Sequence, residues 1–278
     1  MPQAHDDLLS LIKRSPAHVA AHDRQAWLDL FADDASVEDP VGSAVALKRD
    51  GTLAGFWDTF IAPHAIRFEV REDCIQGDDV LRDVVIHTQM RPGVSVQVPA
   101  YLLYKSQQQN GARRLARMAA HWTLKQSKVS TTGPALRAWL PMTAIFARML
   151  RKMGPAWVWA YLASVWRGVG SHGVRSVREL ARAVSAQDAA AVRALFVHAG
   201  AELRFGDLRT TSDALLSLLP PGSQLSIEAP ISAGWVTACR FRVEGPAPCK
   251  GLALFETAPD EMRLRQARFF TASGQASA

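Results

Sequence analysis

One carboxylate in this sequence stands where it could do chemistry. Asp39 lies at a break in a helical pattern and is followed by Pro40 and Gly42. Pro40 fixes the backbone and Gly42 permits a turn, so the carboxylate could project from the rim of a sheet. Within an apolar cavity such a group can accept a proton and deliver it again. The alternative is that Asp39 only opens a turn, because Asp-Pro is a common turn start.

The elements that must position Asp39 are helices followed by strands. Apolar residues at helical spacing predict helices around 8–12, 26–31 and 51–60. Strand patterns follow at 66–71, 80–90, 94–105 and 115–125, with a hairpin signal at 91–93. On the last strand, Met118, Ala120 and Trp122 share one face, while Ala119 and His121 share the other. Helices first and an antiparallel meander second predict an α+β domain.

The end of the chain repeats this order. Helix patterns cover 177–184 and 188–196, and strand patterns cover 224–229, 235–243, 250–257 and 262–271. The phrase Leu195-Phe196 corresponds loosely to Leu30-Phe31, which indicates a diverged internal duplication. We therefore expect two tandem cone-shaped α+β domains, each with N-terminal helices on a curved antiparallel sheet. The expected boundaries are 1–130 and 175–278, with an apolar helical connector at 131–174.

The connector is too apolar to be a flexible linker. It holds four of the eight tryptophans, and prolines divide it into helical pieces: Trp139, Trp157, Trp159 and Trp166, with Pro141 and Pro155. From 133 to 178 there are seven Arg or Lys residues and no acidic residue. Two interpretations remain open for 134–168: helices that pack across the two sheets, or a peripheral contact with a membrane surface.

The phrase from Leu30 to Ser43 closely resembles the segment of bacterial steroid Δ-isomerases that bears the catalytic aspartate. The helix from Gly51 to Phe56, the strand start at 98–101 and the last strand at 117–122 also resemble that family. The chain is thus similar to the superfamily of ketosteroid isomerases and SnoaL-like proteins over roughly residues 8–126. The same fold hosts dehydratases, epoxide hydrolases, polyketide cyclases and binding domains, so the fold alone gives no function.

The resemblance implies a role for each matched residue. Asp39 would be the general base, and Phe56, Met118 and Trp122 would form the wall of the pocket. The position of the family's tyrosine on the first helix is Ser15 here. The position of the family's acidic donor is Tyr101, whose hydroxyl can donate to an enolate oxygen.

Two further residues bear on the site. His87 could form a dyad with Asp39 if it pointed inward, which would suit dehydration or water activation. In the second domain, counting eight residues past Phe196 reaches Arg204, where the same count past Phe31 reaches Asp39. We therefore expect the second domain to be degenerate and mainly structural, within a monomer with an internal pseudo-dimer or within a homodimer.

Composition narrows the function classes. The net charge of +6 permits an anionic partner, but the basic residues are interleaved with apolar ones and no nucleic-acid motif is present. The three cysteines show no metal spacing, and the N-terminal residues lack a secretory profile, so a cytoplasmic setting is expected. Proton transfer by a carboxylate needs no cofactor.

Three functions remain open. The first is a steroid Δ-isomerase-like enzyme that moves a double bond in an apolar ketone. The second is a lyase, dehydratase or hydrolase that acts on a steroid-like or polycyclic substrate in the same pocket. The third is a non-catalytic protein that binds an apolar ligand.

Overall fold

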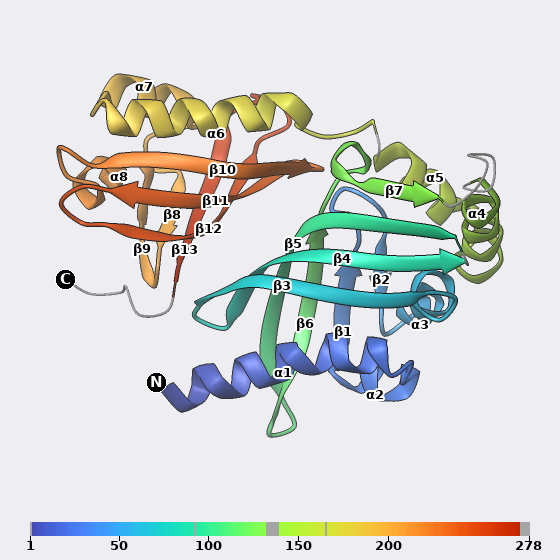
Figure 1. The fold of residues 1–278 in the computed structure, drawn as a ribbon. Helices are drawn as coiled ribbons and strands as arrows, with labels where there is room; N and C mark the ends of the chain where they lie inside the picture. The colour runs from blue at the N-terminus through green and yellow to red at the C-terminus, as the bar shows by residue number, and fades with distance from the viewer. Residues whose placement is uncertain (1, 92, 132–138, 165, 273–278) are drawn as a thin grey trace. The chain divides into compact units, whose positions relative to one another are not determined.

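The computed structural model describes residues 2–91, 93–131, 139–164 and 166–272. The chain forms two compact units, each an α+β domain with helices packed on a curved sheet (Figure 1). Unit 1 comprises Met1–Glu72 and Asp78–Trp166, and unit 2 comprises Asp73–Gly77 and Arg167–Ala278. The tandem α+β fold predicted from the sequence is confirmed.

The helices of unit 1 form because their apolar residues fall on one face. Helix α1 (Pro2–Ala20) buries Leu8, Leu11 and Ile12, which follow helical spacing. Helix α2 (Arg24–Asp29) begins where the Asp23 side chain accepts a hydrogen bond from Ala26 N at 3.0 Å. Helix α3 (Thr52–Phe56) continues into the π-helical turn η1 (Trp57–Ile61). The helix predicted around 26–31 ends earlier than expected, at Asp29.

The sheet of unit 1 has seven strands in the order β2-β1-β6-β5-β4-β3, with β7 paired to β5. The strands are β1 (Phe31–Glu38), β2 (Val45–Leu47), β3 (Ala65–Gln76), β4 (Asp79–Arg91), β5 (Val94–Gln109), β6 (Ala112–His121) and β7 (Lys128–Thr131). Strand β1 runs parallel to β6, and the β4–β5 and β5–β6 pairs are antiparallel. A short turn, η2 (Leu124–Gln126), links β6 to β7. Strand β1 lies between β2 and β6 and ends at Glu38, directly before Asp39.

Unit 2 repeats the order of the first six strands and has no described counterpart of β7. Its strands are β8 (Glu202–Phe205), β9 (Leu208–Thr211), β10 (Gln224–Ala233), β11 (Val236–Glu244), β12 (Cys249–Thr257) and β13 (Leu264–Thr271). They lie in the order β9-β8-β13-β12-β11-β10, and β8 is parallel to β13 as β1 is to β6. Its helices are α6 (Gly170–Ser185), α7 (Ala189–Leu195) and α8 (Leu215–Leu218), the last after a 3-10 turn, η4 (Ser212–Ala214). Asp188 caps α7 by accepting from Ala191 N, as Asp23 caps α2.

The interior of unit 2 is filled with aromatic side chains. Phe269 contacts Phe205, Phe241 and Phe255, with ring centroids 5.1–5.4 Å apart. Because side chains alternate along a strand, Leu203 and Phe205 of β8 face this core and Arg204 points to the opposite face. The prediction that Arg204 takes the place of Asp39 is therefore wrong. A phenylalanine occupies the core-facing position at the end of β8.

The connector helices belong to unit 1. Helix α4 (Trp139–Met153) and helix α5 (Pro155–Ser164) pack on α3 and η1. A Cβ atom at Gly55 would lie 3.2 Å from the Lys152 carbonyl oxygen, so the glycine lets α4 approach α3 closely. The first part of the predicted connector, 132–138, lies outside the described residues.

Candidate functional site

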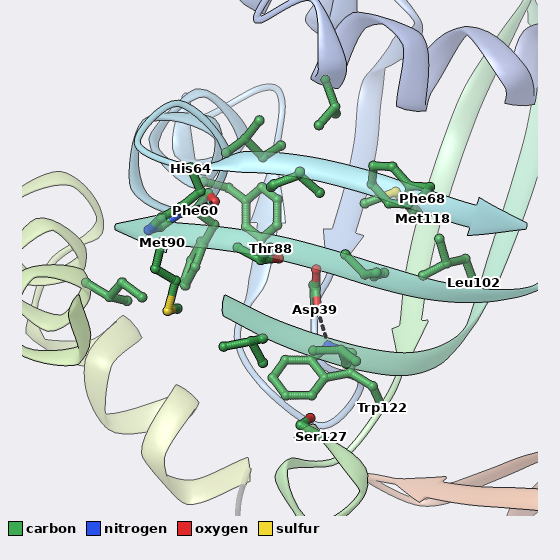
Figure 2. Close-up of a pocket in the computed structure, with 18 of the residues that line it drawn as sticks. Asp39, Phe60, His64, Phe68, Thr88, Met90, Leu102, Met118, Trp122 and Ser127 are labelled. Atoms are coloured by element: carbon green, nitrogen blue, oxygen red, sulfur yellow. Dashed lines mark hydrogen bonds between the residues drawn. The ribbon is translucent and has the colours of Figure 1, made fainter. Parts of the chain in front are cut away.

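A cavity of about 260 Å³ lies in unit 1, between the concave face of the sheet, the helices and η1. Figure 2 shows Asp39 in this cavity, with Phe60, His64 and Met90 on one side and Phe68, Leu102 and Met118 on the other. Among the described residues that line the cavity, Asp39 is the only Asp, Glu, Lys or Arg. The remaining walls are mainly aliphatic and aromatic, so the cavity suits an apolar molecule.

The backbone after β1 holds Asp39 in place. Val41 N donates to Ala120 O of β6 at 2.9 Å, and Gly42 N donates to Glu38 Oε1 at 2.8 Å. Glu38 also pairs with Arg117 at 2.7 Å. The turn is therefore closed by Glu38, which leaves the Asp39 carboxylate free to face the cavity.

The Asp39 carboxylate has one hydrogen-bond donor beside it. Trp122 Nε1, at the end of β6, donates to Asp39 Oδ1 (Figure 2). Burial raises the pKa of Asp39 from 3.8 to about 6, and the Trp122 hydrogen bond opposes part of that rise. A carboxylate with a pKa near 6 is ionised at neutral pH and is a stronger base than an ordinary aspartate.

Three other residues predicted for the site line the same cavity. Phe56 comes from α3, Met118 from β6 and Trp122 from just beyond it. Trp27 and Ser15 close the cavity on the α1–α2 side, where Trp27 Nε1 donates to Ser15 Oγ at 3.1 Å. The structure thus brings Asp39 together with the predicted wall residues and puts a small hydroxyl at the position of the family's helix-one tyrosine.

Tyr101 and His87 lie elsewhere. Leu102 and Tyr104 of β5 line the cavity, so Tyr101 points to the opposite face, where it pairs in register with His121. Ile86 and Thr88 of β4 likewise face the cavity. The predictions that Tyr101 donates to the substrate and that His87 forms a dyad with Asp39 are therefore wrong.

The opposite face of the sheet accounts for both histidines. His87 Nε2 lies 2.9 Å from Glu69 Oε2 on β3. Burial, together with the charge of Arg117, lowers the pKa of the buried His121 to about 3. Neither ring lines the cavity.

A tyrosine that sequence reasoning missed enters the cavity from α5. Tyr161 lines it together with Ile145 of α4. The Tyr161 ring lies 6.0 Å from Phe60 and 6.4 Å from Phe146, measured between centroids. Burial raises the pKa of Tyr161 above its ordinary value, and the nearby Asp39 charge raises it further. The phenol therefore stays protonated and can act as a hydrogen-bond donor in the same cavity as the carboxylate.

His64 is a further polar group of the cavity. Its Nδ1 lies 2.8 Å from Phe60 O, so this nitrogen must carry the hydrogen and donate it. Burial lowers the pKa of His64, and the Arg148 charge lowers it further. The ring is therefore neutral near pH 7, and Nε2 is a hydrogen-bond acceptor.

Comparison with known families assigns this part of the chain. Residues 12–132 match the family model described as a SnoaL-like domain. This part of unit 1 is therefore similar to SnoaL-like domains. The match spans α1 to β7 and so includes Asp39, Phe56, Met118 and Trp122. Helices α4 and α5 follow the matched range and belong to the same compact unit.

Solved structures similar to the chain include three that each span less than half of it. Δ5-3-ketosteroid isomerase from Mycobacterium sp. is 25% identical, with 44% of this chain and 98% of that chain covered and a TM-score of 0.40. A Mycobacterium tuberculosis protein in complex with estradiol-17β-hemisuccinate has the same identity, coverage and TM-score. A computationally designed 17-OHP binder is 22% identical, with 44% and 98% covered and a TM-score of 0.41. No match was found among curated proteins.

The described residues lack two further features. No group of three or more His, Cys, Asp or Glu side chains is placed to hold a metal ion in that part of the chain. None of the helices in the same residues is long and apolar enough to cross a bilayer.

Proposed function

We propose that this protein moves a double bond in an apolar ketone by proton transfer, with Asp39 as the general base. The observation that carries the proposal is a buried carboxylate, with a pKa of about 6, in a mainly apolar cavity that it shares with no other Asp, Glu, Lys or Arg among the described residues. Such a cavity excludes water from a carbanion-like intermediate and keeps one carboxylate beside the substrate for both proton transfers. The substrate class that fits is a steroid-like or other polycyclic β,γ-unsaturated ketone.

The reaction follows from the groups in the cavity. The ionised Asp39 takes the proton from the carbon between the carbonyl and the double bond, and the electron pair moves onto the carbonyl oxygen. The Tyr161 hydroxyl donates a hydrogen bond to that oxygen and stabilises its negative charge. Asp39, now protonated, returns the proton at the far end of the dienolate, which forms the conjugated ketone and restores the carboxylate.

Tyr161 supplies in this proposal what Ser15 cannot. The Ser15 hydroxyl is short and already accepts the Trp27 indole hydrogen bond. A phenol is more acidic than an aliphatic hydroxyl and is therefore the better partner for an enolate oxygen. The α4–α5 addition thus completes the site from outside the range matched by the family model.

The pH dependence of turnover should report Asp39. We expect kcat/KM to rise about tenfold per pH unit below pH 6 and to level off above it, because only the ionised form is a base. Initial rates from pH 4.5 to 8.5 measure this profile.

In Trp122→Phe the inflection of the kcat/KM profile should move to higher pH, because the lost hydrogen bond is the one that lowers the pKa of Asp39. If the inflection did not move, the Trp122 hydrogen bond would not be lowering the pKa of Asp39.

The role of Tyr161 can be separated from its packing. Tyr161→Phe keeps the ring contacts with Phe60 and Phe146 and removes only the donor. We expect kcat to fall by about 10²–10³-fold with a much smaller change in KM. Tyr101→Phe is the matched control, because it removes a hydroxyl on the opposite face of the sheet and should leave kcat within about twofold. Equal losses in the two variants would contradict the assignment.

The proposal is tested by incubating the protein with a β,γ-unsaturated 3-ketosteroid and following the absorbance of the conjugated enone. Enone formation above the buffer rate supports an isomerase. Binding without conversion, measured by quenching of tryptophan fluorescence, would instead support the binding protein. That second candidate is favoured by one observation, the serine at the position of the helix-one tyrosine.

We infer that unit 2 is structural. In unit 2, Phe205 occupies the position at the end of β8 where, in unit 1, the end of β1 leads to Asp39. The interior of unit 2 is filled by aromatic and aliphatic side chains. A second site of the same kind is not part of the proposed function.

A further inference from the structure

The α4–α5 hairpin has two apolar faces, and only one of them is covered. Met149 is fully buried, and Ile145 and Trp157 are 6% and 7% exposed. On the other side, Leu150 is 54%, Trp159 72% and Leu162 39% exposed, and Trp166, just beyond α5, is 88% exposed. Large apolar side chains gathered in this way on a surface mark an interaction site.

Two of these exposed residues, Leu150 and Leu162, line the same groove. A shallow apolar groove between the two helices is lined by Phe146, Ala147, Leu150, Val158 and Leu162. Trp159 and Leu162 are three residues apart on α5 and so lie on neighbouring positions of one helix face. We call this groove together with Trp159 and Trp166 the hairpin surface.

The two hairpin helices themselves carry basic but no acidic residues. From 139 to 164 the sequence contains Arg148, Arg151 and Lys152 and no Asp or Glu. Arg151 is exposed, whereas Lys152 is paired with Asp58 of η1 at 3.1 Å. Tryptophan and leucine flanked by arginine are typical of helices that lie in the headgroup region of an anionic bilayer.

We propose that the hairpin surface binds an anionic phospholipid bilayer, with α4 and α5 lying in its interface. Helices of 15 and 10 residues are too short to span the hydrocarbon core, so they would rest on it. Arginine supplies attraction to the lipid phosphates, and the tryptophans and leucines supply buried apolar area. This inference goes beyond the proposed reaction.

The hairpin surface lies on the same two helices that form part of the cavity wall, so membrane binding there could supply substrate to the cavity. Ile145 and Tyr161, on the covered side of the same two helices, line the cavity that holds Asp39. An apolar ketone concentrates in the bilayer rather than in water. A protein bound through this hairpin would receive its substrate next to the cavity wall that the hairpin forms.

Vesicle flotation of the full-length protein tests the inference. The probes are vesicles of phosphatidylcholine alone and of phosphatidylcholine with 30% phosphatidylglycerol. We expect the protein to float with the anionic vesicles, and the bound fraction to fall when salt is raised from 0.1 to 0.5 M. In the double variant Trp159→Ser, Leu162→Ser, affinity for the anionic vesicles should fall by about 10- to 100-fold.

Leu208→Ser is the matched control, because Leu208 is 52% exposed on β9 of unit 2, outside the hairpin surface. This variant should float as the wild type does. Arg151→Glu should weaken binding to the anionic vesicles only. Wild-type protein that floats with neither vesicle, or a double variant that floats as well as the wild type, would overturn the inference. A concentration-dependent dimer that the double variant abolishes, without vesicle binding, would assign the surface to a second copy and also overturn it.

Discussion

Asp39→Asn should lower kcat on a β,γ-unsaturated ketone by about 10²–10⁴-fold, which is the usual contribution of a positioned general base. The amide is close to isosteric and its oxygen can still accept the Trp122 hydrogen bond, so the cavity should keep its shape. What is lost is the group that takes the proton. The measurement is the initial rate of enone formation at pH 8, together with ligand affinity.

Asp34→Asn is the matched control for this experiment. Asp34 lies on β1, close to Asp39 in sequence, but it is exposed and bonds to Gln107 at 2.9 Å. We expect its kcat to stay within about twofold of the wild type. If Asp39→Asn retained more than a tenth of the wild-type rate, Asp39 would not be the base.

The same substitution should make the protein more stable at alkaline pH. Folding raises the pKa of Asp39 from 3.8 to about 6, so the folded state binds this proton more tightly than the unfolded chain. The resulting stabilisation is complete below pH 4 and is lost as the pH rises through 6. Above pH 6 the buried negative charge costs about 1–3 kcal/mol, the lower value applying when water enters the cavity. Asparagine carries no charge and avoids this cost.

Urea unfolding of the wild type and Asp39→Asn at several pH values checks this prediction. We expect the variant to have the larger free energy of unfolding at pH 8, by about 1–3 kcal/mol, and the difference to shrink as the pH falls from 6 towards 4. Asp34→Asn should show no such trend. A variant that is less stable than the wild type at pH 8 would mean that Asp39 serves the fold, as a turn residue would.

Much of the fold could be predicted because its pattern is local. Period-two and helical spacing located most of the strands and the first helices, and their order gave the α+β class. The short strands β2, β7, β8 and β9 were not predicted, and neither was β1. Leu30 and Phe31 continue the helical spacing of Ala26 and Trp27, yet the chain leaves the helix at Asp29 and pairs with β6 from Phe31. That parallel pairing joins residues about 80 positions apart, and no local pattern encodes it.

The site residues that lie on a single strand could be predicted from side-chain alternation along that strand. Alternation along β6 put Met118 and Trp122 on one face and His121 on the other, as the structure has them. The same rule could not decide between Tyr101 and Tyr104, because the face that β5 turns to the cavity depends on its register with β4 and β6. The role of Trp122 was also underestimated. Its side chain forms part of the cavity wall, and its indole nitrogen also donates a hydrogen bond to Asp39.

Tyr161 could not be found from the matched phrase. It lies 122 residues beyond Asp39, in a helix that follows the SnoaL-like domain, and only tertiary packing brings it to the cavity. One signal was present. The sequence has three tyrosines, and the third stands in an apolar helix too short and too rich in tryptophan to be a linker. For Arg204, counting from a shared phrase failed because unit 2 has one extra residue in this stretch. Phe31 and Phe196 pair with equivalent leucines, Leu115 and Leu264, but the residue equivalent to Val37 is Leu203, seven rather than six positions further on.

The central claim is that one enclosed carboxylate takes a proton from an apolar ketone and returns it. The most direct test is conversion of a β,γ-unsaturated 3-ketosteroid in ²H₂O, with the deuterium content of the conjugated product measured by mass spectrometry. Because the Asp39 carboxylate is buried in a mainly apolar cavity, we predict a product that mostly keeps the substrate's own hydrogen at the carbon that receives the proton. A product fully labelled from solvent at that carbon, or no conjugated product at all, would contradict it.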